Sequence, residues 1–405
     1  DKILNDENSN FVTVAISWLH IIKPKVPGYL ENTSLEKKSN IFYRNIFKFF
    51  KRIIIYLFYL LQGLFYRNNI HKIIEKKDLI IISHCLNKKS IENKDFYFEE
   101  LESLLKKRKI NYYILLINHT NLNSQIINKS IKIKNKLVLE KYLNPYEEFK
   151  IFILQLKEFL RLINLYFYSK SKFEKNCLKN ICLSIFDSQT KLSLRMHILI
   201  KKYLEAINPS TMIFTHEGFA WERLCTNAAK EFDSNINVIG YQHSLVSNKN
   251  LALLKSINGL YNPDIIWASG KKSFKILKSS KELKKVKIIL TGYLKKIRTY
   301  KKNFKIKPNC LVVPGATFSE NIKLFDFSLK CANKSKFVNF TWRVHPLIDF
   351  FKVLRRLSLN VKKLPKNIKI SKNNFSHDIV QNSFVVYNDS AAVIEAASGG
   401  NIPIY

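Results

Sequence analysis

Short apolar segments rich in β-branched residues recur along this chain, and a polar or glycine-containing turn and a helical pattern follow most of them. Such runs are typical of strands buried on both faces of a parallel sheet. Their alternation with helices predicts a doubly wound α/β fold. The predicted strands are residues 78–83, 112–117, 137–140, 211–215, 238–241, 264–267, 286–290, 310–314, 337–342, 368–370 and 384–387, and another opens at Ile402.

The length of the chain indicates more than one domain. Its 405 residues fit two domains of about 150–200 residues each. We predict two Rossmann-like domains facing a cleft, residues 76–255 and 256–405, behind a helical N-terminal extension, residues 1–75. The Lys/Asn-rich stretch 295–308 resembles a linker. Because the chain opens on Asp1 and stops where a strand begins, we expect a fragment whose second domain is truncated.

The charge of the chain is strongly positive, with 68 Lys and Arg against 31 Asp and Glu, a net +37. This excess favours polyanionic partners. The lysines, however, are spread along the whole chain among many Ile and Asn, and no RNA-binding or zinc-finger signature is present. We therefore expect no nucleic-acid partner. The six scattered Cys lack metal-binding spacing and suit a reducing, cytoplasmic compartment.

The most hydrophobic run, residues 53–65, spans 13 residues and is shorter than the roughly 20 needed to cross a bilayer. Basic residues precede it among aromatics, which suits a helix on an anionic membrane surface. Residues 41–66 could therefore hold the protein peripherally on the inner face of the cell membrane. A buried core helix at a domain edge is an equally compatible interpretation.

Polar residues at the predicted strand ends are the candidates for chemistry, because ligands of such sheets bind beyond the C-terminal ends of the strands. His216, Glu217 and Gly218 follow strand 211–215. A carboxylate on a turn where glycine permits close backbone approach is well placed as a general base. A carboxylate favoured by the start of the next helix is the alternative, and Glu222 is the competing acid.

Two further strand ends carry histidines. Gln242 and His243 follow strand 238–241 and offer an amide and an imidazole where a sugar or phosphate would lie. After strand 337–342, Arg343 and His345 alternate and are expected to share one face. His345 precedes Pro346, which stiffens it, and could donate to a phosphate.

The last strand end, residues 384–387, leads through a small polar turn into a helix of small residues, 391–398. Ser390 and the first free N–H groups of this helix, from Ala391 onward, favour a phosphate or another anion. Glu395, one turn further in, could reach a sugar hydroxyl. An ordinary turn capped by Ser390 is the alternative.

Other chemistries fail on inspection of the sequence. Residues 269–273 imitate part of a P-loop, but Ile265 stands where its first glycine belongs. No G-x-G-x-x-G and no G-x-S-x-G occurs, which argues against an NAD enzyme and an α/β-hydrolase. No Asp-x-Asp pair is present to hold a divalent metal on a nucleotide sugar, so we predict no metal and no cofactor.

Together these segments resemble the metal-independent GT-B glycosyltransferases of bacterial surface polysaccharides. The capsule and lipopolysaccharide group with Kdo transferases and sialyltransferases looks most similar. Its acidic-acidic-Gly motif, His-Pro motif and Ser-containing turn match residues 216–218, residues 345–346 and Ser390. The resemblance covers roughly residues 210–405, and His216 departs from it by replacing the first acidic residue.

The resemblance implies a fold, an activity and a site. The fold is GT-B-like, and the enzyme would invert the sugar that it transfers from a nucleotide-sugar donor, with CMP-linked donors as one candidate. Glu217 would deprotonate a glycan or lipid-linked acceptor, and His345 and Ser390 would hold the donor phosphate. Substrate or donor binding is expected of the other strand-end residues: His216, Gly218, Gln242, His243, Arg343, Pro346, Ala391 and Glu395.

Three alternatives stay open. Residues 242–243 also resemble the glycerophosphate transferases of teichoic-acid synthesis, although Ser244 stands where those proteins have glycine. A non-catalytic nucleotide-sugar binding module is the second alternative. A membrane-associated scaffold is the third.

Overall fold

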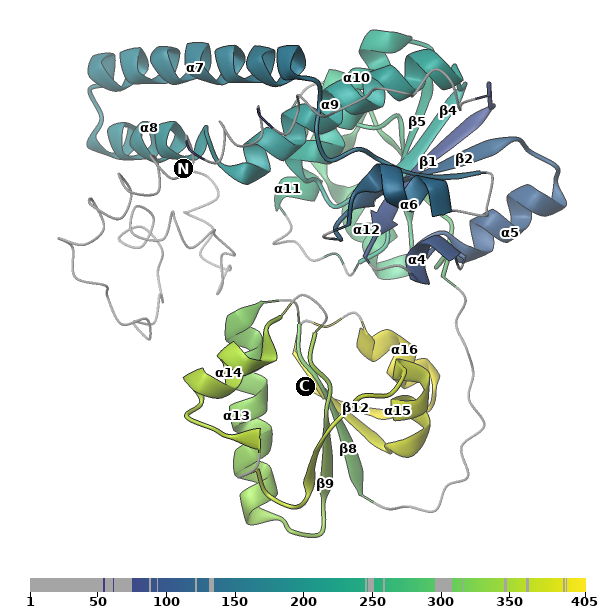
Figure 1. Ribbon diagram of the computed structural model, residues 1–405, viewed down its shortest axis with the longest axis vertical. Helices are drawn as coiled ribbons and strands as arrows, with labels where there is room; N and C mark the ends of the chain where they lie inside the picture. Colours follow the sequence, from purple (N-terminus) through teal and green to yellow (C-terminus); the bar gives the residue numbers. More distant parts are fainter. Residues whose placement is uncertain are drawn as a thin grey trace. The chain divides into compact units, whose positions relative to one another are not determined.

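The computed structural model describes residues 75–86, 89–92, 94–120, 122–130, 135–244, 246, 251–257, 259–295, 308–315, 317–345, 348–361, 364–388, 390 and 392–405, together with Ile54 and Leu61. It divides into two compact units, Asp1–Lys295 (unit 1) and Lys296–Tyr405 (unit 2). Each unit holds its own parallel sheet (Figure 1).

Unit 1 is built on a seven-stranded sheet of order β3-β2-β1-β4-β5-β6-β7, in which every pairing is parallel. Parallel neighbours cannot be joined by a tight hairpin, so crossover segments that contain helices connect these strands. The strands are β1 (Leu79–Cys85), β2 (Tyr112–Asn118), β3 (Lys136–Val138), β4 (Thr211–Thr215), β5 (Asn237–Gln242), β6 (Ile265–Ala268) and β7 (Lys287–Leu290).

Both faces of this sheet are covered, which explains why its strands read as continuous apolar runs. In β1, Ile80 and Ile82 face the layer of α9 and α10, whereas Leu79 and Ile81 face α4 and α5. The helices are α4 (Lys89–Glu92), α5 (Glu99–Lys107), α6 (Ser124–Ser130), α7 (Pro145–Tyr168), α8 (Lys172–Ser184), α9 (Ser188–Ile207), α10 (Ala220–Phe232), α11 (Leu251–Leu254) and α12 (Lys271–Ser279), with short 3-10 turns at Gly259–Tyr261 and Lys281–Leu283.

Unit 2 repeats the plan with five parallel strands of order β10-β9-β8-β11-β12. Helices α13 and α14 pack on one face and α15 and α16 on the other. The elements are β8 (Asn309–Val313), α13 (Phe318–Lys334), β9 (Asn339–Trp342), α14 (Phe350–Arg356), β10 (Ile368–Ile370), α15 (Phe375–Gln381), β11 (Phe384–Tyr387), α16 (Ala392–Ser398) and β12 (Ile402–Ile404).

The strand predictions are confirmed with small shifts at the ends, and so is the doubly wound class. The predicted domain boundary at 255/256 is wrong. Ile265 of β6 pairs with Ile239 of β5, and β7 continues that sheet, so both strands belong to unit 1. The units divide at Lys295, where the predicted linker 295–308 begins. The predicted extension 1–75, with segment 41–66, lies outside the described residues except for Ile54, Leu61 and Glu75.

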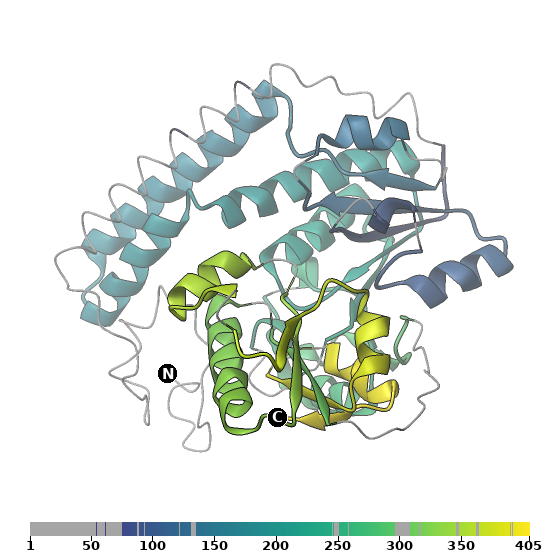
Figure 2. The ribbon, with the colours of Figure 1, turned by 60° about the horizontal axis from the view of Figure 1, so that its bottom comes forward.

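Helices α7 and α8 form a hairpin that runs beside the sheet rather than across it (Figures 1 and 2). Asn144 begins α7 with a capping box: its side chain accepts from the backbone N–H of Glu147. Farther along, Phe159 packs against Phe186 at a ring-centroid distance of 5.6 Å. Within the described part of the chain, no helix is both long enough and apolar enough to cross a membrane.

A buried ion pair fixes the base of this hairpin to α9. The Arg195 Nε donates to Glu148 Oε1 at 2.6 Å, and Lys191 Nζ lies 3.8 Å from Glu148 Oε2. The side chain of Glu148 is 0% exposed, so its negative charge is stabilised mainly by the Arg195 guanidinium, because burial lowers the pKa of Lys191 to about 7. The direction of α7 therefore depends on one carboxylate.

We expect Glu148→Gln to lower the free energy of unfolding by about 3 kcal/mol, because it leaves the buried guanidinium of Arg195 without its counter-charge. Urea unfolding followed by circular dichroism measures the change. Glu158→Gln is the matched control, since Glu158 pairs with Arg161 on the exposed surface of the same helix. Its cost should stay below about 1 kcal/mol. Equal losses in the two variants would contradict the anchoring role of Glu148.

Candidate functional site

Each sheet has one point at which the strand order reverses. In unit 1 the chain lays β1, β2 and β3 toward one edge and then β4 to β7 toward the other, so the reversal lies between β1 and β4. In unit 2 it lies between β8 and β11. Loops that leave such neighbouring strands in opposite directions open a crevice at the C-terminal ends of the strands, where α/β sheets bind ligands.

Histidines gather at the reversal in unit 1. His84, near the end of β1, lies 3.0 Å through Nε2 from the hydroxyl of Thr215, the last residue of β4. Its Nδ1 lies 2.9 Å from Nε2 of His119, which follows β2. The ring of His84 also meets the edges of Tyr97 and Trp221, at centroid distances of 5.5 and 5.6 Å. The two reversal strands are thus joined by a polar and aromatic cluster.

Glu217 and His243 form the open part of this cluster. The His243 Nε2 lies 3.4 Å from Glu217 Oε1, and the two side chains are 20% and 27% exposed. The ring of His243 packs against Tyr97 at 4.6 Å. Burial lowers the pKa of His243, although Glu217 and Glu222 oppose the shift. A carboxylate reachable from solvent therefore lies beside an imidazole that is neutral at neutral pH, an arrangement suited to proton abstraction.

Glu222 holds the loop that carries Glu217. Its Oε2 accepts hydrogen bonds from three consecutive backbone N–H groups, those of residues 217–219, at 2.8, 2.7 and 2.9 Å. Glu222 is 1% exposed and cannot meet a substrate. The competing acid of the sequence is therefore a structural carboxylate, and Glu217 is the one that faces outward.

The next residue, Arg223, holds the segment that packs against this loop. Its guanidinium donates to the backbone carbonyls of Ala252 and Lys255, at 2.5 and 2.7 Å. Gly218 has φ +84°, and a Cβ there would lie 2.3 Å from the carbonyl oxygen of Ala252. The close approach that we predicted at Gly218 is made by the backbone of the same unit, and only glycine permits it.

The structure places two other predicted binding residues inside the protein. His216 is 2% exposed, and its Nδ1 lies 3.3 Å from Glu222 Oε2. Gln242 is 0% exposed, and its amide donates to the carbonyl of Ser244. Both side chains are buried under the loops that carry Glu217 and His243. The prediction that they bind substrate directly is therefore corrected.

Sequence reasoning missed His84, His119, Tyr97 and Trp221. His84 had an available signal: it is a polar residue at the end of a predicted strand, like Glu217, but the strand prediction stopped at Ser83. Nothing in the sequence places Tyr97, which lies before α5, beside His243.

At the reversal in unit 2 the two loops are tied to each other. The backbone N–H of Gly315, after β8, donates to the Asn388 side chain after β11 at 3.4 Å. Thr317 begins α13 with a capping box in which Glu320 reaches back, and a Cβ on Gly315 would lie 2.3 Å from Glu320 Oε2. The glycine therefore leaves room for the cap, and the N-terminus of the 17-residue α13 opens at the crevice.

The predicted donor residues that the structure describes follow β9 and β11 of unit 2. His345 follows β9, and burial lowers its pKa while Glu320 opposes the shift. Ser390 is half-buried, and its carbonyl oxygen accepts from the N–H of Val393 at 3.2 Å. Glu395 lies in α16. Pro346 and Ala391 lie outside the described residues.

The side chain of Arg343, which we predicted to bind the donor, contacts residues of its own unit. Its Nη1 donates to the buried Asp378 at 2.6 Å and to the carbonyl of Asn373 at 2.9 Å. Its guanidinium also lies 5.1 Å from the Phe375 ring centroid. Because β9 ends at Trp342, Arg343 and His345 do not alternate along a strand, and the prediction that they share one strand face is wrong. Arg343 fixes α15 to the end of β9.

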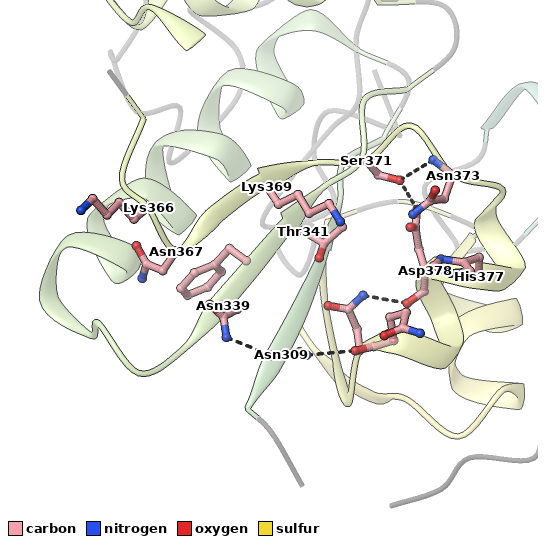
Figure 3. Close-up of a pocket in the computed structure, with 13 residues that line it drawn as sticks. Asn309, Asn339, Thr341, Lys366, Asn367, Lys369, Ser371, Asn373, His377 and Asp378 are labelled. Carbon is pink, nitrogen blue, oxygen red and sulfur yellow. Dashed lines mark hydrogen bonds between the residues drawn. The ribbon is translucent and has the colours of Figure 1, made fainter. Parts of the chain in front are cut away.

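A polar cavity of about 310 Å³ lies on the α15 side of β9 and β10 (Figure 3). Its wall includes Asn309, Asn339, Lys369 and His377, and none of the predicted site residues lines it. Asn339 donates to Asn309, and Asn309 to the carbonyl of Gln381, so these wall amides bond within the unit.

The histidine cluster predicts how stability depends on pH. Burial, with His119 adding to it, lowers the pKa of His84 from 6.5 to about 3. Burial also lowers the pKa of His119. At these two histidines the unfolded chain therefore binds more protons below pH 6.5 than the folded chain does. The contribution of His84 should be complete above about pH 7 and should fall by up to about 1 kcal/mol per pH unit as the pH decreases.

Urea unfolding from roughly pH 4 to pH 8 measures this slope. His84→Gln keeps a hydrogen-bonding side chain but removes the titrating group, so its slope should be shallower. An unchanged slope in the variant would show that His84 is not the source.

Comparison with known proteins supports the fold only. No protein family matches the sequence, and no curated protein matches it. Among solved structures, MnaA of S. aureus, in a co-structure with UDP, has a TM-score of 0.50 at 12% identity. A Listeria monocytogenes protein assigned as a UDP-N-acetylglucosamine 2-epimerase has the same values. Each comparison covers 81% of this chain and 78% of the other.

Identities of 12% carry no conclusion about activity. The likeness nevertheless extends over both units, and each unit has the strand order of a Rossmann-like domain. The chain has an α/β, GT-B-like fold.

Proposed function

We propose that this protein is a metal-independent, inverting glycosyltransferase that moves a sugar from a nucleotide-sugar donor to a surface-polysaccharide or lipid-linked acceptor. The observation that carries the proposal is the Glu217–His243 pair at the strand-order reversal of unit 1. It supplies a solvent-reachable base where α/β sheets bind ligands. The fold and the resemblance of residues 210–405 to such transferases agree with it.

Glu217 would remove the acceptor proton as the acceptor oxygen attacks the anomeric carbon. The bond between that carbon and the donor phosphate breaks on the opposite side, so one displacement inverts the configuration, and the proton passes to Glu217. His243 would orient the carboxylate, since its neutral imidazole lies beside it. Tyr97 and Trp221 offer aromatic edges against which a sugar can pack.

Unit 2 would hold the donor. The N-terminus of α13, capped by Thr317 and Glu320, lies at its reversal, and His345 and Ser390 follow the strands on either side of β8. These groups suit the negative charge that develops on a departing nucleoside phosphate. MnaA, which shares the fold, was solved with UDP, so UDP-linked sugars join CMP-linked sugars as the first donors to examine.

His243 also supports a second candidate function. His243 belongs to the Gln-His segment that resembles glycerophosphate transferases, and it lies within the open part of the cluster. In that case the same base would activate an acceptor hydroxyl to attack the polyol-bearing phosphorus of a CDP-linked polyol, so that the polyol phosphate is transferred and CMP leaves. Product analysis separates the two, because only the second transfers phosphorus.

Glu217→Gln should lower the transfer rate by roughly 10²–10⁴-fold while donor binding stays intact, because the amide keeps the shape but cannot accept the proton. The rate is measured with radiolabelled donor, and donor binding by thermal shift against UDP-, CMP-, GDP- and CDP-linked ligands. Glu205→Gln, at an exposed position on α9, is the control and should transfer at the native rate.

Native-rate transfer by folded Glu217→Gln protein would contradict the assignment of the base. A donor-induced shift without turnover, across acceptors, would instead favour a nucleotide-sugar binding module.

His345→Ala and Ser390→Ala should each weaken donor binding by about tenfold or more, because each removes a hydrogen bond to a charged phosphate. Titration of the donor with thermal-shift detection gives the dissociation constants. His377→Ala, on the wall of the polar cavity in the same unit, is the control and should bind donor normally. If His377→Ala alone weakens binding, the donor site lies in that cavity.

A further inference from the structure

The helix α7 has two different long faces. One packs into the unit and contains its buried residues, among them Ile151, Gln155 and Leu162. The opposite face points outward and carries exposed apolar side chains at helical spacing. Tyr146, Phe149, Leu160, Phe167 and Tyr168 are 65%, 52%, 57%, 72% and 78% exposed. Helices of globular proteins seldom leave so many large apolar side chains in water along one face.

Basic side chains lie among these apolar ones. Lys150, Lys157 and Arg161 are exposed and fall on the same outward face, spaced by seven and four residues. Lys150 Nζ lies 4.4 Å from the ring centroid of Tyr146. Glu147 pairs with Lys202 and Glu148 with Arg195, whereas Glu158 pairs with Arg161 and offsets its charge, so Lys150 and Lys157 carry the positive charge of this face.

We infer that the outward face of α7 binds an anionic membrane surface. An apolar face interspersed with Lys and Arg fits the boundary between headgroups and acyl chains, where the apolar side chains insert and the cations meet lipid phosphates. The turn after α7 extends the pattern, because Phe167 and Tyr168 at the helix end precede the basic residues Lys170 and Lys172.

Charge argues against two other occupants. A second copy of α7 would bring the same line of cations onto this one. Residues 41–66 of the chain contain Arg and Lys but no Asp or Glu, so that segment would also place positive charge against positive charge. Anionic lipid is the partner that complements both the apolar and the basic side chains.

The described residues of unit 1 leave this face exposed. The hairpin of α7 and α8 extends beside the sheet in both views (Figures 1 and 2). Its buried ion pair at Glu148 and the packing of Phe159 on Phe186 hold α7 from the opposite side. The outward face therefore belongs to a firmly attached helix. This membrane site is independent of the transferase chemistry.

The test is flotation of the full chain with phosphatidylcholine vesicles that contain or lack phosphatidylglycerol. The native protein should bind the anionic vesicles and bind the neutral ones much more weakly. The double variant Leu160→Asp, Phe167→Asp should lose about tenfold or more in partitioning, because two inserting side chains become charged. Replacing Lys150 and Lys157 by Gln should cost about fivefold per residue on anionic vesicles only.

The control is Phe337→Asp, Phe351→Asp, which adds the same charge at two exposed aromatics of unit 2, 76% and 70% exposed. It should float like the native protein. Unchanged flotation of the α7 variants would overturn the inference, as would equal binding to neutral and anionic vesicles. A native dimer that Leu160→Asp, Phe167→Asp makes monomeric, seen by light scattering, would overturn it in favour of a second copy.

Discussion

Parallel pairing on both sides is the constraint on which the rest of this structure depends. A strand with two parallel neighbours must be joined to them by crossovers, and those crossovers cover both faces of the sheet. The chain can then extend the sheet only by adding strands at one edge and later at the other. The reversal between β1 and β4, and that between β8 and β11, follow from this growth. The candidate site of each unit lies where the strand order reverses.

The residues around the two strand-order reversals differ in chemical character. In unit 1, neutral histidines, aromatic edges and one reachable carboxylate surround the strand ends, a setting suited to a polyhydroxylated ligand and proton transfer. In unit 2, a glycine loop, a histidine and a helix N-terminus capped by Thr317 and the Glu320 carboxylate surround them. This chemical difference supports the proposed division between acceptor and donor more directly than the shared fold does.

The strands were predictable because parallel burial leaves continuous apolar runs, as in residues 211–215. The domain boundary was not, because an apolar run does not reveal which sheet it joins: β6 belongs to unit 1 only through its backbone pairing with β5. Polar residues at the strand ends could be identified from the sequence, but whether each side chain points outward or into the core could not. Glu217 faces outward, whereas its neighbour His216 lies buried against the backbone of Gly240. The spacing of residues in the sequence does not determine which of the two is buried.

The adjacent residues Glu222 and Arg223 together fix the loop that carries Glu217. One residue binds the N–H groups of the loop, and the next binds the carbonyls of the segment at Ala252 that packs on Gly218. Loop and segment are therefore held by adjacent positions of a single helix turn, and α10 rather than the loop sets where the Glu217 backbone lies. A carboxylate so supported needs little reorganisation before it meets its substrate.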